Sequence, residues 1–323
     1  MKKLKIAIIG AGISGVTLAN NLKEIAEVKI FEKSRGVGGR MSSRYSEKFS
    51  FDHGTQCFSA RGREFQNFLQ SFIDSGDVAP WVGKVINIED KKITPRFWFE
   101  THLVACPNMN SLCKKMAQGL DIALGVEVAT LTKKDDLWNL CDINGNDLGD
   151  FNLVISSAPP KQTKKLFGSY FTTKEIAMQP CFSMMLGFDK KWPHDWIFAK
   201  VKNNPIKLIA INSSKPSRNC DVTSIVIQTK KSWSLENVDS NLEELQKILL
   251  ENFTNLVGIS AKEASYISLH RWLYALVDEE GGEIFFDQKN ALGATGDWVL
   301  ESRIEDVWIA ANKLSAMILD FYA

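Results

Sequence analysis

The stretch LKIAIIGAGISG, residues 4–15, decides the fold that we predict for this chain. Its near-continuous apolar run is typical of a strand that is buried on both faces of a parallel sheet. Three glycines follow at GxGxxG spacing. Gly10 allows a tight turn, Gly12 lets the backbone approach a pyrophosphate, and Gly15 lets a helix pack closely on the strand.

The residues after the glycines complete a recognisable unit. Residues 13–25 have the apolar spacing of a helix, and its amino end at Ser14 would offer N–H groups and a partial positive charge to a phosphate. Residues 28–31 predict a second short strand, and the carboxylate of Glu32 at its end would accept hydrogen bonds from a ribose diol. GxGxxG by itself also suits a purely structural turn, but this context favours a dinucleotide site.

A second glycine-rich loop follows directly, in residues 34–43. Gly39 permits another close backbone approach to phosphate, and Arg40 adds a guanidinium fork. A flexible loop with a solvated arginine is the alternative interpretation. The run from Glu32 and Lys33 to Arg40 resembles the FAD-binding entry of flavin-dependent amine oxidases and their relatives. The resemblance implies that Lys33, Gly39 and Arg40 lie along FAD, with the glycine and the arginine against its diphosphate.

Composition narrows the class of protein. The chain has 323 residues, enough for about two domains, and 45% of them are hydrophobic and 24% charged, as in an ordinary globular protein. A net charge of +1 gives no electrostatic footprint for nucleic acid. No apolar run reaches the length of a membrane span. We therefore expect neither a nucleic-acid partner nor a membrane span.

The cysteines, the histidines and the amino terminus carry weaker signals. Six cysteines without a CxxC pair predict reduced, mainly structural thiols, and four histidines without ligand spacing predict no metal site. Lysines ahead of an apolar segment imitate a signal peptide, but that segment holds the nucleotide glycines. We therefore expect it to be retained and the protein to be cytoplasmic.

The run Asp52–Arg61, DHGTQCFSAR, is a turn if it is taken alone, and its histidine, His53, would more often be a surface or satisfied histidine than a base. The run is similar to the segment that follows the GGR loop in renalase and its bacterial relatives. That similarity implies that Thr55 and Gln56 lie near the flavin.

The run HRWLYA, residues 270–275, has the same two interpretations. It predicts the end of an amphipathic strand with packed aromatics, yet an imidazole, a guanidinium and two amphipathic rings would also suit a planar charged substrate. It resembles the His-Arg-Trp-x-Tyr-Ala stretch of bacterial renalases, although Leu273 stands where that family more often has a basic residue. The resemblance implies that His270, Trp272 and Tyr274 are pocket walls, with Trp298 close by. We assign no acid or base.

The end of the chain predicts a return to the cofactor. Residues 292–297 form a strand that runs into a turn at Gly296 and Asp297, where the carboxylate would accept hydrogen bonds from ribityl hydroxyls. The start of the final helix, at Arg303 and Ile304, would offer N–H groups toward the flavin O2 region.

Together with the amino-terminal glycines, this ending predicts FAD as the cofactor and not NAD. Some amine oxidases hold FAD through a cysteine near this carboxyl-terminal motif. The last cysteine here is Cys220, so we expect non-covalent FAD. Residues 122–131 predict one strand and residues 138–143 another, and Asn144–Gly145 is a strong hairpin signal after it. Resemblance to FAD proteins of the glutathione-reductase kind implies a three-strand crossover and a backbone contact from Val128 to adenine.

The middle of the chain predicts a second domain that is inserted into the first. Its periodicity indicates an antiparallel sheet with a covering helix, from strands at 182–188, 206–212, 222–228 and 264–272 and a helix at 242–256. The predicted fold is an α/β Rossmann-type FAD-binding domain, glutathione-reductase-like, with an inserted α+β antiparallel-sheet substrate domain. We place the FAD-binding domain in residues 1–64, 104–165 and 283–323 and the substrate domain in residues 65–103 and 166–282.

The resemblance to the renalase branch implies a function. It is FAD-dependent oxidation of the 2- and 6-dihydro isomers of NAD(P)H, with hydride passing to flavin N5 and O2 reoxidising the flavin to give H2O2. The implied partners are a small substrate, a dihydronicotinamide or an amine, and molecular oxygen. A flavin-containing amine oxidase is the first alternative, and a desaturase-like or non-catalytic FAD-binding protein is the second.

Overall fold

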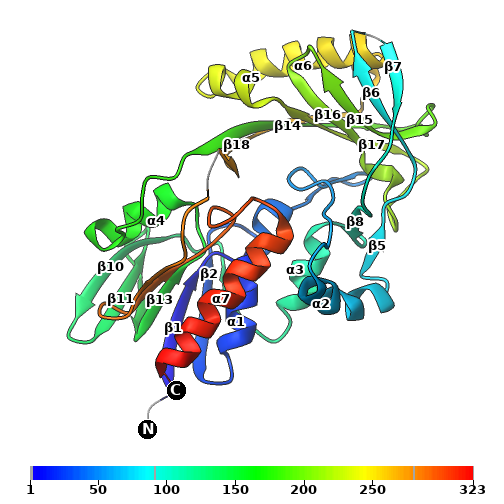
Figure 1. Cartoon of the computed structure of the whole chain (residues 1–323). Coiled ribbons are helices and arrows are strands. Elements are labelled where there is room, and N and C mark those ends of the chain that lie inside the picture. The colour runs from blue at the N-terminus through cyan, green and yellow to red at the C-terminus, as the bar shows by residue number, and fades with distance from the viewer. Residues whose placement is uncertain (1–2, 91, 279–280, 323) are drawn as a thin grey trace. The chain divides into compact units, whose positions relative to one another are not determined.

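The computed structural model describes residues 3–90, 92–278 and 281–322 (Figure 1). The chain divides into two compact units. The first unit consists of residues 1–40, 113–177 and 276–323, and the second unit of residues 41–112 and 178–275.

These divisions differ from the predicted domain boundaries in one respect that matters. Residues 41–64, which we assigned to the FAD-binding domain, pack with the second unit because strand β4 (Ser50–Phe51) contacts strand β17 (Thr223–Thr229) of its large sheet. Packing and cofactor contact are separate properties, so the assignment of residues 41–64 to the cofactor site stays a prediction.

The first unit contains a six-stranded sheet in the order β19-β20-β13-β1-β2-β9. Its central strand β1 pairs in parallel with β2 on one side and with β13 on the other, so that Ile6 lies opposite both Val28 and Leu153. The strands are β1 (Leu4–Ile9), β2 (Ala26–Glu32), β9 (Asp121–Leu124), β13 (Leu153–Ser156), β19 (Phe285–Asp287) and β20 (Leu292–Ala294). The predicted Rossmann-type fold is confirmed, since β1 is buried as a parallel central strand must be.

Helices from both ends of the chain cover this sheet. Helix α1 (Ile13–Leu22), blue in Figure 1, packs beside helix α7 (Ile304–Tyr322), red in the same figure. Asn21 of α1 donates a hydrogen bond to the Oδ1 of Asn312 of α7 over 2.8 Å. The carboxyl terminus therefore completes the unit that the amino terminus begins.

One predicted strand was wrong. We expected a continuous strand over residues 122–131, but the structure has two, β9 and β10 (Val128–Lys134), in different sheets. Gly125 has a φ of 72°, and this left-handed residue turns the chain between them. Strand β10 forms a three-stranded antiparallel sheet with β11 (Leu137–Asp142) and β12 (Asp147–Phe151), as the expected crossover requires.

The shorter elements of the first unit follow these strands. They are helix α4 (Pro160–Phe167) and the 3-10 turns η1 (Gly39–Met41) and η2 (Gly168–Tyr170), while helix α3 (Asn110–Met116) crosses from the second unit to the first. Trp298 is fully buried in the core of the first unit, and its indole N–H donates to the carbonyl of Ala158. That it lies close to the predicted pocket walls stays a prediction.

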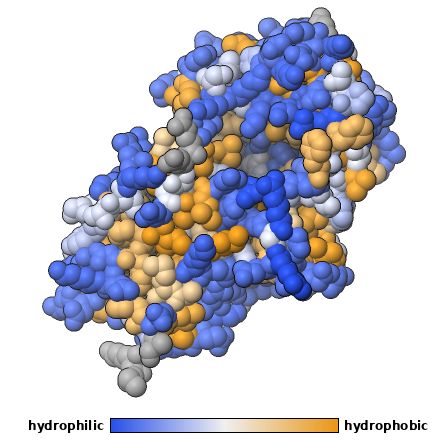
Figure 2. All heavy atoms as spheres, in the orientation of Figure 1, coloured by the Kyte–Doolittle hydropathy of each residue, from blue (hydrophilic) through white to orange (hydrophobic). Residues whose placement is uncertain are grey.

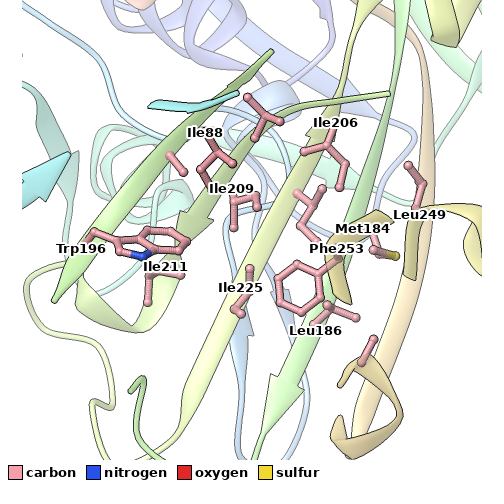
Figure 3. Close-up of a cluster of buried hydrophobic side chains, with 14 of the residues drawn as sticks. Ile88, Met184, Leu186, Trp196, Ile206, Ile209, Ile211, Ile225, Leu249 and Phe253 are labelled. Carbon is pink, nitrogen blue, oxygen red and sulfur yellow. The ribbon is translucent and has the colours of Figure 1, made fainter. Parts of the chain in front are cut away.

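The second unit is built on a seven-stranded sheet in the order β18-β14-β17-β16-β15-β6-β7. Its strands are β6 (Lys84–Glu89), β7 (Lys92–Arg96), β14 (Met178–Phe188), β15 (Trp196–Lys202), β16 (Ile206–Ile211), β17 and β18 (Tyr266–Val277). Helix α6 (Leu242–Val257) packs its apolar residues on one face, where Leu249 and Phe253 meet side chains of the central strands (Figure 3). The expected covering helix is present. The sheet is antiparallel, as expected, in the pairs β14–β17, β17–β16, β16–β15 and β6–β7, but β15 and β6 pair in parallel, so the sheet is mixed.

Smaller elements surround that sheet. They are β3 (Arg44–Tyr45), β5 (Val78–Pro80), β8 (Leu103–Ala105), α2 (Arg63–Asp74), α5 (Lys231–Glu236), η3 (Asn212–Ser214) and η4 (Ala261–Glu263). No helix among the described residues combines the length and the apolar character that a bilayer crossing needs. The face drawn in Figure 2 is largely hydrophilic, with apolar areas of smaller extent.

Candidate functional site

The first glycine loop lies at the carboxyl end of β1, between β1 and α1. Gly10 has a φ of 103°, and a Cβ placed on it would lie 2.5 Å from the Oγ of Ser157. A Cβ on Gly15 would overlap the carbonyl oxygen of Gly10. Both positions therefore require glycine, as the predicted tight turn and the predicted close packing of helix on strand demand.

The second glycine loop faces the first. The N–H of Gly38 donates to the carbonyl of Ala11 over 2.9 Å, and a Cβ on Gly39 would lie 3.3 Å from the Cα of Gly12. No side chain stands between Gly12 and Gly39. The two loops thus present bare backbone to each other, which is what a diphosphate needs on both sides.

Helix α1 begins at the two glycine loops, and no side chain caps its first N–H groups. Its N-cap is Gly12, which has no side chain to cap the first N–H groups, and its first turn holds no acidic residue. Ser14 is buried in that turn, and its hydroxyl has no hydrogen-bond partner among the described residues. A buried hydroxyl without a partner is costly unless a ligand satisfies it, so Ser14 fits a phosphate at this helix start.

Glu32 lies where the sequence predicts it, at the end of β2, and is buried. Its Oε2 accepts from the N–H of Ala11 and its Oε1 from the N–H of Ser34, both over 2.8 Å. A carboxylate accepts about four hydrogen bonds, so capacity for a ribose diol remains after these two. Glu32 therefore also fastens the first glycine loop to β2.

The structure joins two predicted cofactor residues from opposite ends of the sequence. The guanidinium of Arg40 lies 2.7 Å from the Oδ2 of Asp297, which is buried. Burial raises the pKa of the Asp297 carboxyl, although the Arg40 charge opposes this. Its other oxygen, Oδ1, is buried and accepts no hydrogen bond from any other described residue. Asp297 is thus held in place by one oxygen and offers the second to a ligand.

The remaining cofactor candidates of the first unit differ in exposure and in their contacts. Lys33 is exposed, and Val128 is half-buried on β10. Ile304 begins α7 as expected, but the guanidinium of Arg303 is engaged by the carboxylate of Asp306 at 2.7 and 3.0 Å. Gly296 is tightly enclosed, since a Cβ there would lie 2.8 Å from the indole nitrogen of Trp298.

In the second unit, three rings form a cluster that we call the ring wall: His53, His270 and Trp272. The His53 ring stacks on Trp272 at 5.2 Å and meets His270 edge-on at 5.1 Å, while His270 and Trp272 meet edge-on at 4.5 Å. The indole N–H of Trp272 donates to the carbonyl of His53 over 3.1 Å, which fixes the ring. His53, which we expected to be a surface or satisfied histidine rather than a base, is buried and is thus part of the candidate site.

Strand periodicity explains why β18 contributes two of these rings. Alternate residues of a strand share one face, so Tyr266, His270, Trp272 and Tyr274 point the same way. Tyr266 stacks on Phe51 at 5.0 Å. Because β18 is an edge strand, this face of it stays half-buried.

Both histidines of the ring wall are neutral at physiological pH. Burial lowers the pKa of His53 to about 4, with further lowering from His270 and Arg44 and an opposing effect of Asp52. Burial and the Arg44 charge lower the pKa of His270 to about 4. Neither imidazole is therefore a general acid near pH 7.

The loop that carries Thr55 and Gln56 is held by buried polar contacts. The Nε2 of Gln56 donates to the carbonyls of Asp52 and Gly54, and the Nε2 of Gln228 donates to the same Gly54 carbonyl. Gln56 has no side-chain N–H left for a ligand, whereas Thr55 is half-buried. The structure gives Gln56 the role of shaping its loop.

That loop rests on a cluster that sequence reasoning missed, which we call the Asp52 cluster. The carboxylate of Asp52 is fully buried and lies 3.0 Å from the Nζ of Lys215 and 2.8 Å from a guanidinium nitrogen of Arg218, both buried as well. It also accepts from the hydroxyl of Ser43 and the N–H of Met109. The cationic partners hold the pKa of Asp52 at about 2 against the effect of burial. Asp52 and Lys215 are 163 positions apart in the sequence, so no local pattern predicts their contact.

Metal ligands do not assemble in the part of the chain that the structure describes. No group of three His, Cys, Asp or Glu side chains there is arranged to hold an ion. All six cysteines are free thiols. Burial raises the pKa of Cys57 to about 11 and that of Cys113 to about 12, so neither is a reactive thiolate.

The sequence comparisons match only part of the chain. Residues 8–72 match the NAD(P)-binding Rossmann-like domain family. A 4,4'-diapophytoene desaturase (4,4'-diaponeurosporene-forming) of Staphylococcus aureus strain Newman is 35% identical over 78 residues, and the match covers 21% of this chain and 16% of the desaturase. The enzyme of the same name from strain MRSA252 is 33% identical over 78 residues, with the same shares. The chain thus spans only 16% of the length of these curated relatives.

Similar solved structures cover the whole chain. A protein of Exiguobacterium sp. 255-15, assigned as a protoporphyrinogen oxidase, has a TM-score of 0.80 at 11% identity and covers 98% of this chain and 99% of its own. Wild-type putrescine oxidase bound to putrescine has a TM-score of 0.72 at 12% identity with the same coverage. Residues 8–72 are therefore similar to an NAD(P)-binding Rossmann-like domain, and 98% of the chain shares the fold of these oxidase structures.

Proposed function

We propose that this chain is an FAD-dependent oxidoreductase that takes hydride from a small substrate and passes the electrons to molecular oxygen, giving H2O2. The observation that carries this proposal is the Arg40–Asp297 pair beside the two glycine loops. A diphosphate alone would need only the loops and the start of α1. The buried second oxygen of Asp297 calls for a further hydroxyl, which the ribityl chain of FAD supplies.

The residues of the first unit fit FAD one group at a time. Backbone at Gly12 and Gly39 and the hydroxyl of Ser14 would hold the diphosphate, Glu32 the adenosine ribose, and Asp297 the ribityl chain. We retain the adenine contact of Val128 and the flavin contact of the α7 start as proposals. When bound, FAD supplies a hydride acceptor and a route for electrons to oxygen.

We propose 2- and 6-dihydro isomers of NAD(P)H as substrates. Their oxidation leaves an aromatic pyridinium and requires no proton transfer from the carbon that loses hydride. The ring wall suits this requirement, because its two imidazoles are neutral and its indole is fixed by a hydrogen bond. The tasks of His270 and Trp272 are then to orient a planar ring and exclude water. Tyr274, on the same face of β18, would extend that wall.

Amine oxidation is the second candidate, and the fold shared with putrescine oxidase favours it. The match to diapophytoene desaturase keeps a desaturase-like reaction as a further alternative, but that match covers only 21% of this chain. All three reactions would use the same cofactor cradle and differ in the substrate.

An anaerobic titration of the purified protein with 6-dihydro-NAD tests the proposal. We expect a yellow protein whose visible flavin band bleaches on addition of the substrate and returns with air, with H2O2 formed in proportion. Bleaching by putrescine or another amine, and not by the dihydronicotinamide, would replace the proposed substrate with the second candidate. A colourless protein that takes up no added FAD would reject the proposal as a whole.

A further inference from the structure

A cation without a counter-charge lies beside the ring wall. Arg44, on β3, donates from Nη1 to the hydroxyl of Ser268 over 2.7 Å, and Ser268 precedes His270 by two residues on the same face of β18. No described carboxylate lies within ion-pair distance of the Arg44 guanidinium. Arg44 and the face that it joins are half-buried, so a ligand can reach them.

Positive charges also outnumber negative charges next to the ring wall. Asp52 directly precedes His53, and its single carboxylate is shared by two buried cations, Lys215 and Arg218. With Arg44, three positive charges therefore accompany one negative charge around this wall. Burial is the main cause of the lowered pKa values of His53 and His270, and the Arg44 charge lowers both further.

We propose that Arg44 is a specificity-determining residue: with the ring wall it binds planar rings that carry a carboxylate or a neutral amide and it excludes rings that carry an ammonium group. This inference rests on the proposed function and names the substrate class of that site. It favours the dihydronicotinamide, with its amide, over the amine.

Competing effects support the direction of this preference. The indole of Trp272 would attract a cation, and such a contact at a half-exposed site is worth about two- to fivefold in affinity. At an effective dielectric constant of about 20, a guanidinium about 12 Å from an ammonium group weakens its binding about tenfold, and more at shorter distances. A carboxylate instead gains from the planar guanidinium fork. The Arg44 charge therefore outweighs the attraction of the ring.

Three probes of one shape and different charge test the inference: benzoate, benzamide and benzylamine. Ligand-observed NMR titrations of the full-length, cofactor-loaded protein at pH 7.5 would give the three dissociation constants. We expect benzoate to bind about tenfold more tightly than benzylamine, with benzamide between them. In Arg44→Gln this ratio should fall to about one. In Arg44→Lys it should persist, because the charge sets the preference.

Arg63→Gln, at the exposed start of α2 in the same unit, is the matched control and should keep the wild-type ratio. Thermal unfolding shows whether each variant is folded, and Arg44→Lys keeps the test decisive if Arg44→Gln is not. Equal or tighter binding of benzylamine by the wild type would overturn the inference, and so would an unchanged ratio in folded Arg44→Gln. Failure to bind FAD, seen by absorbance before the titrations, would reject the proposed function instead, and the probe ratio would then be measured on the cofactor-free protein.

Discussion

The carboxylates of Asp297 in the first unit and of Asp52 in the second unit are both buried, but they are used differently. Asp297 has one cation on one oxygen, and its other oxygen accepts nothing from another described residue. Asp52 receives two cations, a hydroxyl and a backbone N–H. A buried carboxylate with spare capacity is prepared for a ligand, whereas a saturated one holds the fold together.

The largest expected effect comes from a methyl group at Gly15, which would disturb the first glycine loop. In Gly15→Ala the new methyl group would overlap the carbonyl of Gly10 and push α1 away from β1. We expect the variant to retain little or no flavin and to lose about 1–3 kcal/mol of stability from overpacking. Absorbance of the purified protein and urea unfolding measure the two effects. Gly36→Ala is the control, because a Cβ there meets nothing within 4 Å. Full flavin content in Gly15→Ala would contradict the cradle.

The second test removes the saturated carboxylate. Asp52→Asn would leave Lys215 and Arg218 buried with no negative charge, and breaking such an ion cluster costs about 3–5 kcal/mol. Urea unfolding should show this loss. Asp189→Asn, which breaks an exposed pair with Lys48, should cost no more than about 1 kcal/mol. Comparable losses in the two variants would mean that burial does not set the importance of Asp52.

The third test sharpens the difference between the two carboxylates. Asp297→Asn should weaken FAD binding about tenfold, equal to about 1.4 kcal/mol, because a charged acceptor is lost. Stability without cofactor should change less than in Asp52→Asn. Fluorescence titration of the apoprotein with FAD measures the affinity, and Asp320→Asn on the exposed end of α7 is the control. The role of Asp297 would be wrong if its variant bound FAD like that control.

The smallest effect is a pH dependence of the second unit. His53 and His270 have a pKa of about 4 in the folded chain and an ordinary value of 6.5. Between these values the unfolded chain binds more protons, so stability is unaffected above pH 6.5 and falls as the pH is lowered toward 4. In urea unfolding between about pH 4.5 and 6.5, His53→Phe should make the loss of stability with falling pH less steep. An unchanged slope would place the titration elsewhere.

Local sequence determined the strand, turn and helix at the start of the first unit. Strand β1, the tight turn at Gly10 and the place of Glu32 at the end of β2 were predicted correctly, because a parallel strand, a tight turn and a helix start impose residue types within a few positions. Their contacts with a cofactor stay predictions. The Asn144–Gly145 signal likewise marked the hairpin between β11 and β12. The error at residues 122–131 arose because Gly125 breaks a run whose two halves pair with different sheets.

Tertiary structure alone decided which charged and aromatic groups meet. Arg40 and Asp297 were each expected at the cofactor, but only the fold pairs them. His53 was passed over since nothing near it in sequence indicates a partner, and β18 brings His270 and Trp272 to it. Backbone geometry is encoded over a few residues and can be recognised there, whereas charge balance and ring contacts depend on residues that are distant in the chain and become neighbours only when it folds.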